Sequence, residues 1–135
     1  MKNLNLTDYK FIDKHKKETS IFFTKANYYI LDFWFLNCLP CRNEHKIIQK
    51  KYNQLFKNKI ETIGISIDDY SEKWKEYLTS NHYEWPNYLQ TPSKKITETL
   101  SIKEFPFYVL IKNNGEIIGR YKSFSEILKW FKLNQ

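Results

Sequence analysis

The sequence predicts an α/β fold, a three-layer α/β/α sandwich with a mixed central sheet. Two runs rich in apolar residues, 27–36 and 61–68, are typical of strands buried on both faces. An amphipathic stretch separates them, and a strand–helix–strand unit requires a parallel pair. Later, an Asn-Asn-Gly turn at 113–115 joins two more apolar runs and predicts an antiparallel hairpin.

The first 26 residues are weakly patterned, and we expect two short edge strands there, within 8–13 and 19–23. The first helix is predicted from Leu39, since a proline at position 40 suits a first helical turn. Its apolar stripe recurs at helical spacing from position 48 to position 56.

Three more helices are predicted. Asp69 and Glu72 fit a capping box that opens the second helix. A short helix is expected within 93–100. Ser123 and Glu126 form the capping box of the last helix, at 123–133. The helices and strands together give a sandwich with helices on both faces of the sheet.

Length and composition limit the function classes. The 135 residues fit one domain, 1–135, with no internal repeat. The net charge is +7, but the lysines are scattered as on a solvated surface, so no nucleic-acid partner is predicted. The longest apolar stretch, 28–36, has nine residues, short of the roughly 20 that a membrane span needs. We expect a monomer without a membrane span in this chain.

The two cysteines, Cys38 and Cys41, are the strongest chemical signal. Cys38 ends the first buried strand and Cys41 falls in the first helical turn, a spacing that permits a disulfide between them. Unpaired N–H groups and the dipole at a helix N-terminus stabilise a thiolate, so we expect a lowered pKa for Cys38. Cys38 is therefore the candidate nucleophile and Cys41 the resolving thiol.

Asp32 precedes Cys38 by six residues, inside the apolar strand. A carboxylate in apolar surroundings has a raised pKa, which suits a general base or acid near neutrality. We expect Asp32 to move the proton of the shielded Cys41 thiol. The alternative is a strand residue whose side chain reaches solvent.

Other interpretations of the cysteine pair remain open. A C-x-x-C pair also occurs as a structural disulfide or as half of a zinc site. Cys38, Cys41 and His45 together could hold Cu(I), which would make the chain a copper-binding module or thiol metallochaperone. A related peroxidase class is disfavoured because its T-x-x-C pattern is absent. No cofactor is predicted, since the sequence contains neither G-x-G-x-x-G nor a phosphate loop.

The stretch LDFWFLNCLPCR at 31–42 resembles the thioredoxin-fold active site, D-F-W-A-x-W-C-x-P-C. The chain is similar in particular to the TlpA/ResA-type thiol-disulfide oxidoreductases over about residues 18–133. The segments that carry this likeness are CLPCRNE, IGISIDDYSEKWKEYL, EWPNYL and EFPFYVLIKNNGEIIGRY.

The resemblance implies a thioredoxin-like sandwich and an enzyme that exchanges disulfides with protein substrates, in the reducing direction. It implies that Pro106 is a cis-proline facing the Cys38–Cys41 disulfide and that the backbone of Phe105 pairs with the bound substrate chain. An ordinary trans proline at a strand entry is the alternative.

The expected substrate-binding positions around the disulfide are Asn37, Leu39, Pro40 and Trp34. For Trp34, plain core packing is the alternative.

Three departures from the family pattern stand out. Asn37 replaces the aromatic residue usually found before the first cysteine, Lys46 replaces a frequent proline, and Asp32 stands where TlpA-like chains often carry Asn. Because no cofactor motif is present, we expect the electrons to come from a partner protein. The resemblance favours a periplasmic or envelope-facing location with the signal or anchor absent from this chain, with a cytoplasmic location as the alternative. Leu39 and Pro40 do not reveal the direction of redox flux, because a potential difference of about 30 mV corresponds to only about 1.4 kcal/mol.

Overall fold

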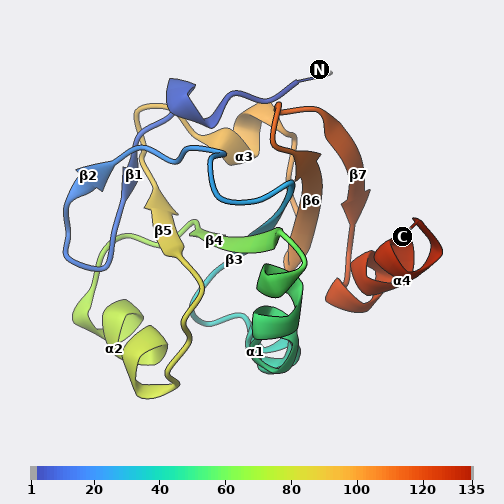
Figure 1. Ribbon diagram of the computed structural model, residues 1–135. Coiled ribbons are helices and arrows are strands. Elements are labelled where there is room, and N and C mark those ends of the chain that lie inside the picture. Colours follow the sequence, from blue (N-terminus) through green and yellow to red (C-terminus); the bar gives the residue numbers. More distant parts are fainter. Residues whose placement is uncertain (1–2, 135) are drawn as a thin grey trace.

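A seven-stranded mixed sheet with helices on both faces forms the centre of the computed structural model, which describes residues 3–134 (Figure 1). The strand order is β2-β1-β5-β4-β3-β6-β7. The strands are β1 (Phe11–Ile12), β2 (Glu18–Thr19), β3 (Tyr28–Trp34), β4 (Ile60–Ser66), β5 (Asn87–Gln90), β6 (Phe107–Lys112) and β7 (Ile117–Tyr121). The helices are the 3-10 turn η1 (Leu6–Asp8), α1 (Leu39–Lys57), α2 (Glu72–Ser80), α3 (Ile96–Thr99) and α4 (Phe124–Asn134). The predicted α/β/α sandwich with a mixed sheet is confirmed.

The middle of the sheet is parallel and its flanks are antiparallel. β3 pairs parallel with β4, and β4 with β5, whereas β6 runs antiparallel to β3 and continues into the β6–β7 hairpin. All seven residues of β4 are buried, as expected for a strand covered on both faces. The predicted parallel pair around α1 and the hairpin at the Asn-Asn-Gly turn are both present.

Residues of β3 alternate between the two faces of the sheet, as strand geometry requires. Ile30 and Trp34 join the apolar cluster under α1, α2 and α4, whereas Leu31 and Phe33 join the cluster on the other face. Asp32 has the parity of Ile30 and Trp34, and it contacts His45 of α1. The acid is therefore directed towards the helix that carries the cysteines.

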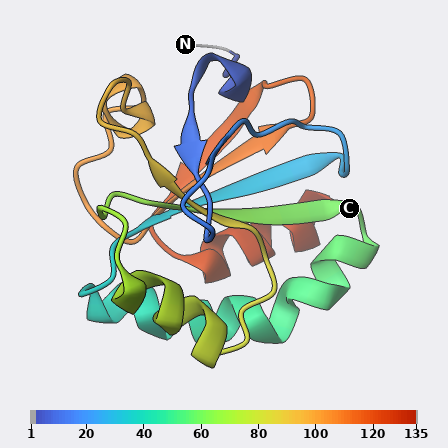
Figure 2. The ribbon, with the colours of Figure 1, turned by 90° about the vertical axis from the view of Figure 1, so that its left-hand side faces the viewer.

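Figure 2 shows how unequally the two faces are covered. α1, α2 and α4 lie under one face, and the short elements η1 and α3 lie over the other. The cluster on this second face includes Leu6 of η1, Ile96 of α3 and several residues that precede β3. The weakly patterned N-terminal segment thus supplies core residues that a longer helix would otherwise provide.

β5 is a strand that the sequence analysis did not predict. It has four residues, pairs parallel with β4 and antiparallel with β1, and lies directly after Pro86. Asn87 and Gln90 are polar, and four residues are too few to show a clear alternation. The edge strand predicted within 8–13 is β1. β2 is Glu18–Thr19, so only Thr19 of the expected 19–23 segment lies in a strand, and the prediction for residues 20–23 is wrong.

The N-cap of α2 also differs from the prediction. Ser71, not Asp69, is the cap, and its side chain accepts a hydrogen bond from the backbone N–H of Trp74 at 3.1 Å. The helix begins at Glu72, so the expected Asp69–Glu72 capping box does not form. Within the described part of the chain, no helix combines the length and the apolar character needed to cross a membrane.

We expect Ser71→Ala to lower the free energy of unfolding by about 1 kcal/mol, because the Trp74 N–H loses its acceptor. Asp69→Ala is the matched control and should change stability by less than about 0.5 kcal/mol, as at other exposed positions. Urea unfolding of both variants measures the difference. A larger loss from Asp69→Ala than from Ser71→Ala would contradict this assignment of the cap.

Candidate active site

Cys38 and Cys41 form a disulfide at the N-terminus of α1, with a Cα–Cα distance of 5.3 Å. Cys38 is the N-cap, and its Sγ accepts a hydrogen bond from the backbone N–H of Cys41 at 3.2 Å. Pro40 occupies the first turn, where its missing N–H costs no helical hydrogen bond. The predicted start of the helix at Leu39 is confirmed, but β3 ends at Trp34, so Cys38 follows a short loop and does not end the strand as predicted.

Both cysteines are buried, and they differ slightly in exposure. Cys38 is 5% exposed and Cys41 is 0% exposed. Asn37, Leu39 and Pro40 are exposed around them, and Leu39 presents 67% of its surface to solvent. Cys38 is therefore the cysteine that retains some exposed surface, beside an exposed rim.

The loop before Cys38 is held by two hydrogen bonds to its backbone. Arg42 Nε donates to the carbonyl of Leu36 at 2.7 Å, and Leu36 N–H donates to Asp68 Oδ2 at 2.8 Å. Asp68 is itself bound by the hydroxyl of Ser66 at the end of β4. These bonds fix the loop between α1 and the neighbouring strand end. Arg42 belongs to the CLPCRNE segment that carries the family likeness, whereas no sequence pattern pointed to Asp68.

Phe105 and Pro106 are joined by a cis peptide bond, as the family resemblance implied. The Phe105 ring packs edge-on against Phe35, with centroids 5.7 Å apart. Both rings border the apolar cluster that contains Cys38 and Cys41. The segment that carries the cis-proline thus lies beside the loop that presents the disulfide.

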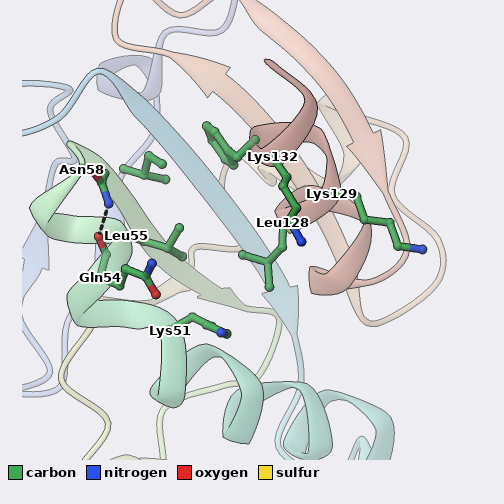
Figure 3. Close-up of a pocket in the computed structure, with 9 residues that line it drawn as sticks. Lys51, Gln54, Leu55, Asn58, Leu128, Lys129 and Lys132 are labelled. Carbon is green, nitrogen blue, oxygen red and sulfur yellow. Dashed lines mark hydrogen bonds between the residues drawn. The ribbon is translucent and has the colours of Figure 1, made fainter. Parts of the chain in front are cut away.

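A cleft of about 380 Å³ opens beside Phe105. Its lining includes Ile67, which follows β4, and the side chains of Asp68, Asp69 and Glu98. Lys95 is the cation in this lining. The cavity in Figure 3, about 400 Å³, is a different one: α4 and the C-terminal part of α1 line it, at the end of α1 away from the disulfide.

Asp32 is fully buried, so the alternative in which its side chain reaches solvent is wrong. Its Oδ2 lies 3.1 Å from Nε2 of His45, which is also fully buried. Asp32 Oδ1 has no hydrogen-bond partner among the described residues. The other ring nitrogen of His45, Nδ1, lies 2.8 Å from the hydroxyl of Tyr77 on α2.

These contacts overturn the copper-site alternative. Both ring nitrogens of His45 are taken by Asp32 and Tyr77, so His45 does not join Cys38 and Cys41 as a third ligand. In residues 3–134, no group of three or more His, Cys, Asp or Glu side chains is arranged to hold a metal ion.

Trp34 is fully buried, so its side chain lies behind the site and is not available for direct contact with a substrate. Its indole N–H donates to Asn87 Oδ1 at 3.2 Å, and its ring stacks on Trp74 with centroids 6.4 Å apart. This is the core-packing alternative of the sequence analysis. Gly64 makes it possible, because a Cβ on Gly64 would overlap Asn87 Oδ1.

Glu44 connects three elements around the site. Its Oε1 accepts hydrogen bonds from the backbone N–H of Phe124 at 2.7 Å and from the hydroxyl of Tyr108 at 3.2 Å. Burial raises the pKa of Tyr108, and the nearby carboxylates Asp32 and Glu44 raise it further, so this hydroxyl stays protonated and donates. Glu44 thereby links α1 to β6 and to the first turn of α4.

Comparison with known proteins agrees with this geometry. The sequence model of a family described as thioredoxin-like matches residues 26–117. The chain belongs to the thioredoxin-like family. The resemblance noted from the LDFWFLNCLPCR stretch is thereby confirmed.

Solved structures with the same fold include thiol-disulfide oxidoreductases. The thioredoxin domain of one from Bacteroides vulgatus is 24% identical, with a TM-score of 0.79 over 96% of this chain and 97% of that chain. A thiol:disulfide interchange protein from a Bacteroides species is 25% identical, with a TM-score of 0.79 over 93% of this chain and 84% of that one. StoA from Bacillus subtilis is 18% identical, with a TM-score of 0.70 over 94% and 99%. No curated protein sequence matches the chain.

We expect Glu44→Ala to lower the free energy of unfolding by about 2 kcal/mol, because two donors packed in the protein lose their acceptor. Glu76→Ala, at an exposed position of α2, is the matched control and should cost less than about 0.5 kcal/mol. Chemical unfolding under oxidising and reducing conditions measures both. Equal losses from the two variants would contradict the linking role of Glu44.

Proposed function

We propose that this thioredoxin-like protein is a thiol-disulfide oxidoreductase that reduces protein disulfides. Cys38 is the nucleophile, Cys41 the resolving thiol and Asp32 the group that accepts the Cys41 proton. The observation that carries the proposal is the Cys38–Cys41 disulfide at the start of α1, where Cys38 retains a little exposed surface and Cys41 is fully buried.

The position of Cys38 supports its role as nucleophile. The N–H of Cys41 points at its sulfur, and an N–H at a helix N-terminus stabilises negative charge there. In the reduced protein, the Cys38 thiolate attacks one sulfur of a substrate disulfide. A mixed disulfide forms between Cys38 and the substrate, and the other substrate sulfur leaves as a thiolate.

The enclosed position of Cys41 supports its role in the second step. Its thiol gives a proton to Asp32, and the new thiolate attacks Cys38 Sγ. The mixed disulfide breaks, the substrate leaves as a thiolate that takes up a proton, and Cys38–Cys41 becomes the disulfide. Two electrons pass to the substrate. An electron-donor protein must reduce the pair again before the next turnover.

The exposed surroundings of Cys38 support the binding of a protein chain. Asn37, Leu39 and Pro40 form an accessible rim. The half-buried Phe105 lies between this site and the cleft lined by Ile67. We propose that an extended substrate segment lies across the rim and pairs with the backbone of Phe105 before Pro106.

The reducing direction of this proposal rests on the resemblance to the TlpA/ResA-type oxidoreductases, because Leu39 and Pro40 do not reveal the direction of redox flux. The reduction potential of the Cys38–Cys41 couple tests it.

We expect Cys41→Ser to accumulate a mixed disulfide with a fluorophore-labelled peptide disulfide, because the resolving thiol is absent. Mass spectrometry of the reduced, peptide-treated variant measures the adduct. Cys38→Ser should form no adduct and should lose turnover to the background level, whereas the wild type should release reduced peptide. If Cys41→Ser forms no adduct and the wild type reduces no peptide disulfide, the proposed function is wrong.

We expect the Cys38–Cys41 couple to have a reduction potential nearer to the value of about −270 mV for thioredoxin than to the value of about −120 mV for strongly oxidising proteins. Equilibration with glutathione or dithiothreitol buffers, read out by alkylation of free thiols, gives the value. A potential at the oxidising end would leave the exchange chemistry intact but overturn the reducing direction.

A further inference from the structure

His45 lies enclosed beside Asp32, the proposed acceptor of the Cys41 proton, and has no role of its own in the proposed exchange steps. Both side chains are fully buried, and His45 Nε2 lies 3.1 Å from Asp32 Oδ2. An isolated carboxylate in an apolar interior favours its neutral form strongly. A hydrogen bond to the ionised form favours that form instead.

His45 lies four residues after Cys41 on α1, one turn further along the same helix face. Cys41 and His45 are both fully excluded from solvent, on the side of α1 that faces the sheet, where α1 packs on β4 and His45 contacts Asp32 of β3. One helix face therefore carries the resolving thiol and the partner of the proposed base.

We propose that His45 is a positioning residue for the resolving step. Nε2–H of His45 donates to Asp32 Oδ2, which orients the carboxylate and leaves Oδ1 as the acceptor for the Cys41 proton. Asp32 Oδ1, which has no other partner among the described residues, is the oxygen left free by this arrangement. This inference rests on the proposed role of Asp32.

Rings fix the orientation of the His45 imidazole. Trp34 meets it edge-on with centroids 4.7 Å apart, and Tyr83 and Trp85 each lie 5.7 Å from it. The hydroxyl of Tyr77 binds Nδ1, the nitrogen opposite the one that faces Asp32. Packing and this hydrogen bond together hold Nε2 towards the carboxylate.

The surrounding groups define what a pH experiment would report. Burial raises the pKa of Tyr77, and Tyr83 raises it further, so the Tyr77 hydroxyl remains protonated across the neutral range. Other titratable or charged groups around the pair come from α1, from β6 and from the segment after α2: Arg42, Glu44, Tyr108 and Tyr83.

The test measures the two exchange steps separately. Alkylation of Cys38 against pH reports the first step. For the second, the mixed disulfide with a labelled peptide is formed at low pH, where Cys41 stays protonated, and release of the peptide is followed after a jump to higher pH. The variants are His45→Phe, which removes the donor, and His45→Gln, which keeps an amide donor. His15→Gln, at an exposed position, is the matched control.

We expect His45→Phe to slow peptide release at neutral pH about 10-fold and to move its rising limb about one pH unit upwards, because a hydrogen bond to the carboxylate is lost. Alkylation of Cys38 should stay within about twofold of the wild type, and His45→Gln should recover release to within about threefold. His15→Gln should match the wild type. With Asp32→Asn, His45→Phe should cause no further slowing, because residues that act through one group are not additive.

The opposite results are equally specific. Equal slowing by His45→Phe with and without Asp32→Asn, or an unmoved pH limb, would overturn the role of His45 while the proposed function stands. Unchanged release in Asp32→Asn alone would instead refute the proton-accepting role of Asp32, and the inference with it. If His45→Phe does not fold, Tyr77→Phe replaces it. Tyr77→Phe should slow peptide release about threefold, and it should cause no slowing when Asp32→Asn is already present. Additive slowing of peptide release by the two substitutions would overturn the proposal.

Discussion

The burial of one carboxylate beside a strand–helix junction is the constraint on which the rest of the site depends. β3 carries Asp32 on the face that α1 covers, and a short loop joins the end of β3 at Trp34 to the start of α1 at Leu39. An acid enclosed in this way needs a polar partner, because a buried charge without one is strongly destabilising. The helix that supplies the cysteines also supplies that partner, His45. The same helix, α1, therefore carries both the cysteines and the hydrogen-bond partner of the buried acid.

The strands, turns and helix starts of this chain are predictable wherever a local sequence pattern determines local structure. Three such patterns each involve only a few neighbouring residues: the buried run of β3, Pro40 in the first turn of α1, and the Asn-Asn-Gly turn. The structure that each one forms can therefore be predicted without knowledge of the tertiary contacts. The position of Cys38 at the helix start follows from those same local rules. The cis bond before Pro106 was accessible only through the family resemblance, since sequence alone permits both isomers at a proline.

The failures share a different physical origin. β5 forms because it pairs with β4 on one edge and with β1 on the other. Its four residues carry no local pattern that would predict a strand. Serine and aspartate are both favourable N-cap residues. Ser71 is the N-cap because α2 begins at Glu72, and the sequence does not fix that starting point. His45 looked like a metal ligand from its spacing to Cys41, but its partners come from β3 and α2, 13 and 32 residues away in sequence. Long-range contacts of this kind leave no periodic signal.

Gly64 and Asn87 occupy one small volume between β4 and β5, next to the indole of Trp34. The amide of Asn87 fills the space that a side chain on residue 64 would need. We therefore expect the residues at positions 64 and 87 to covary among related sequences. A lineage that acquires a side chain at the first must shrink or lose the amide at the second, and its buried indole must then find another acceptor.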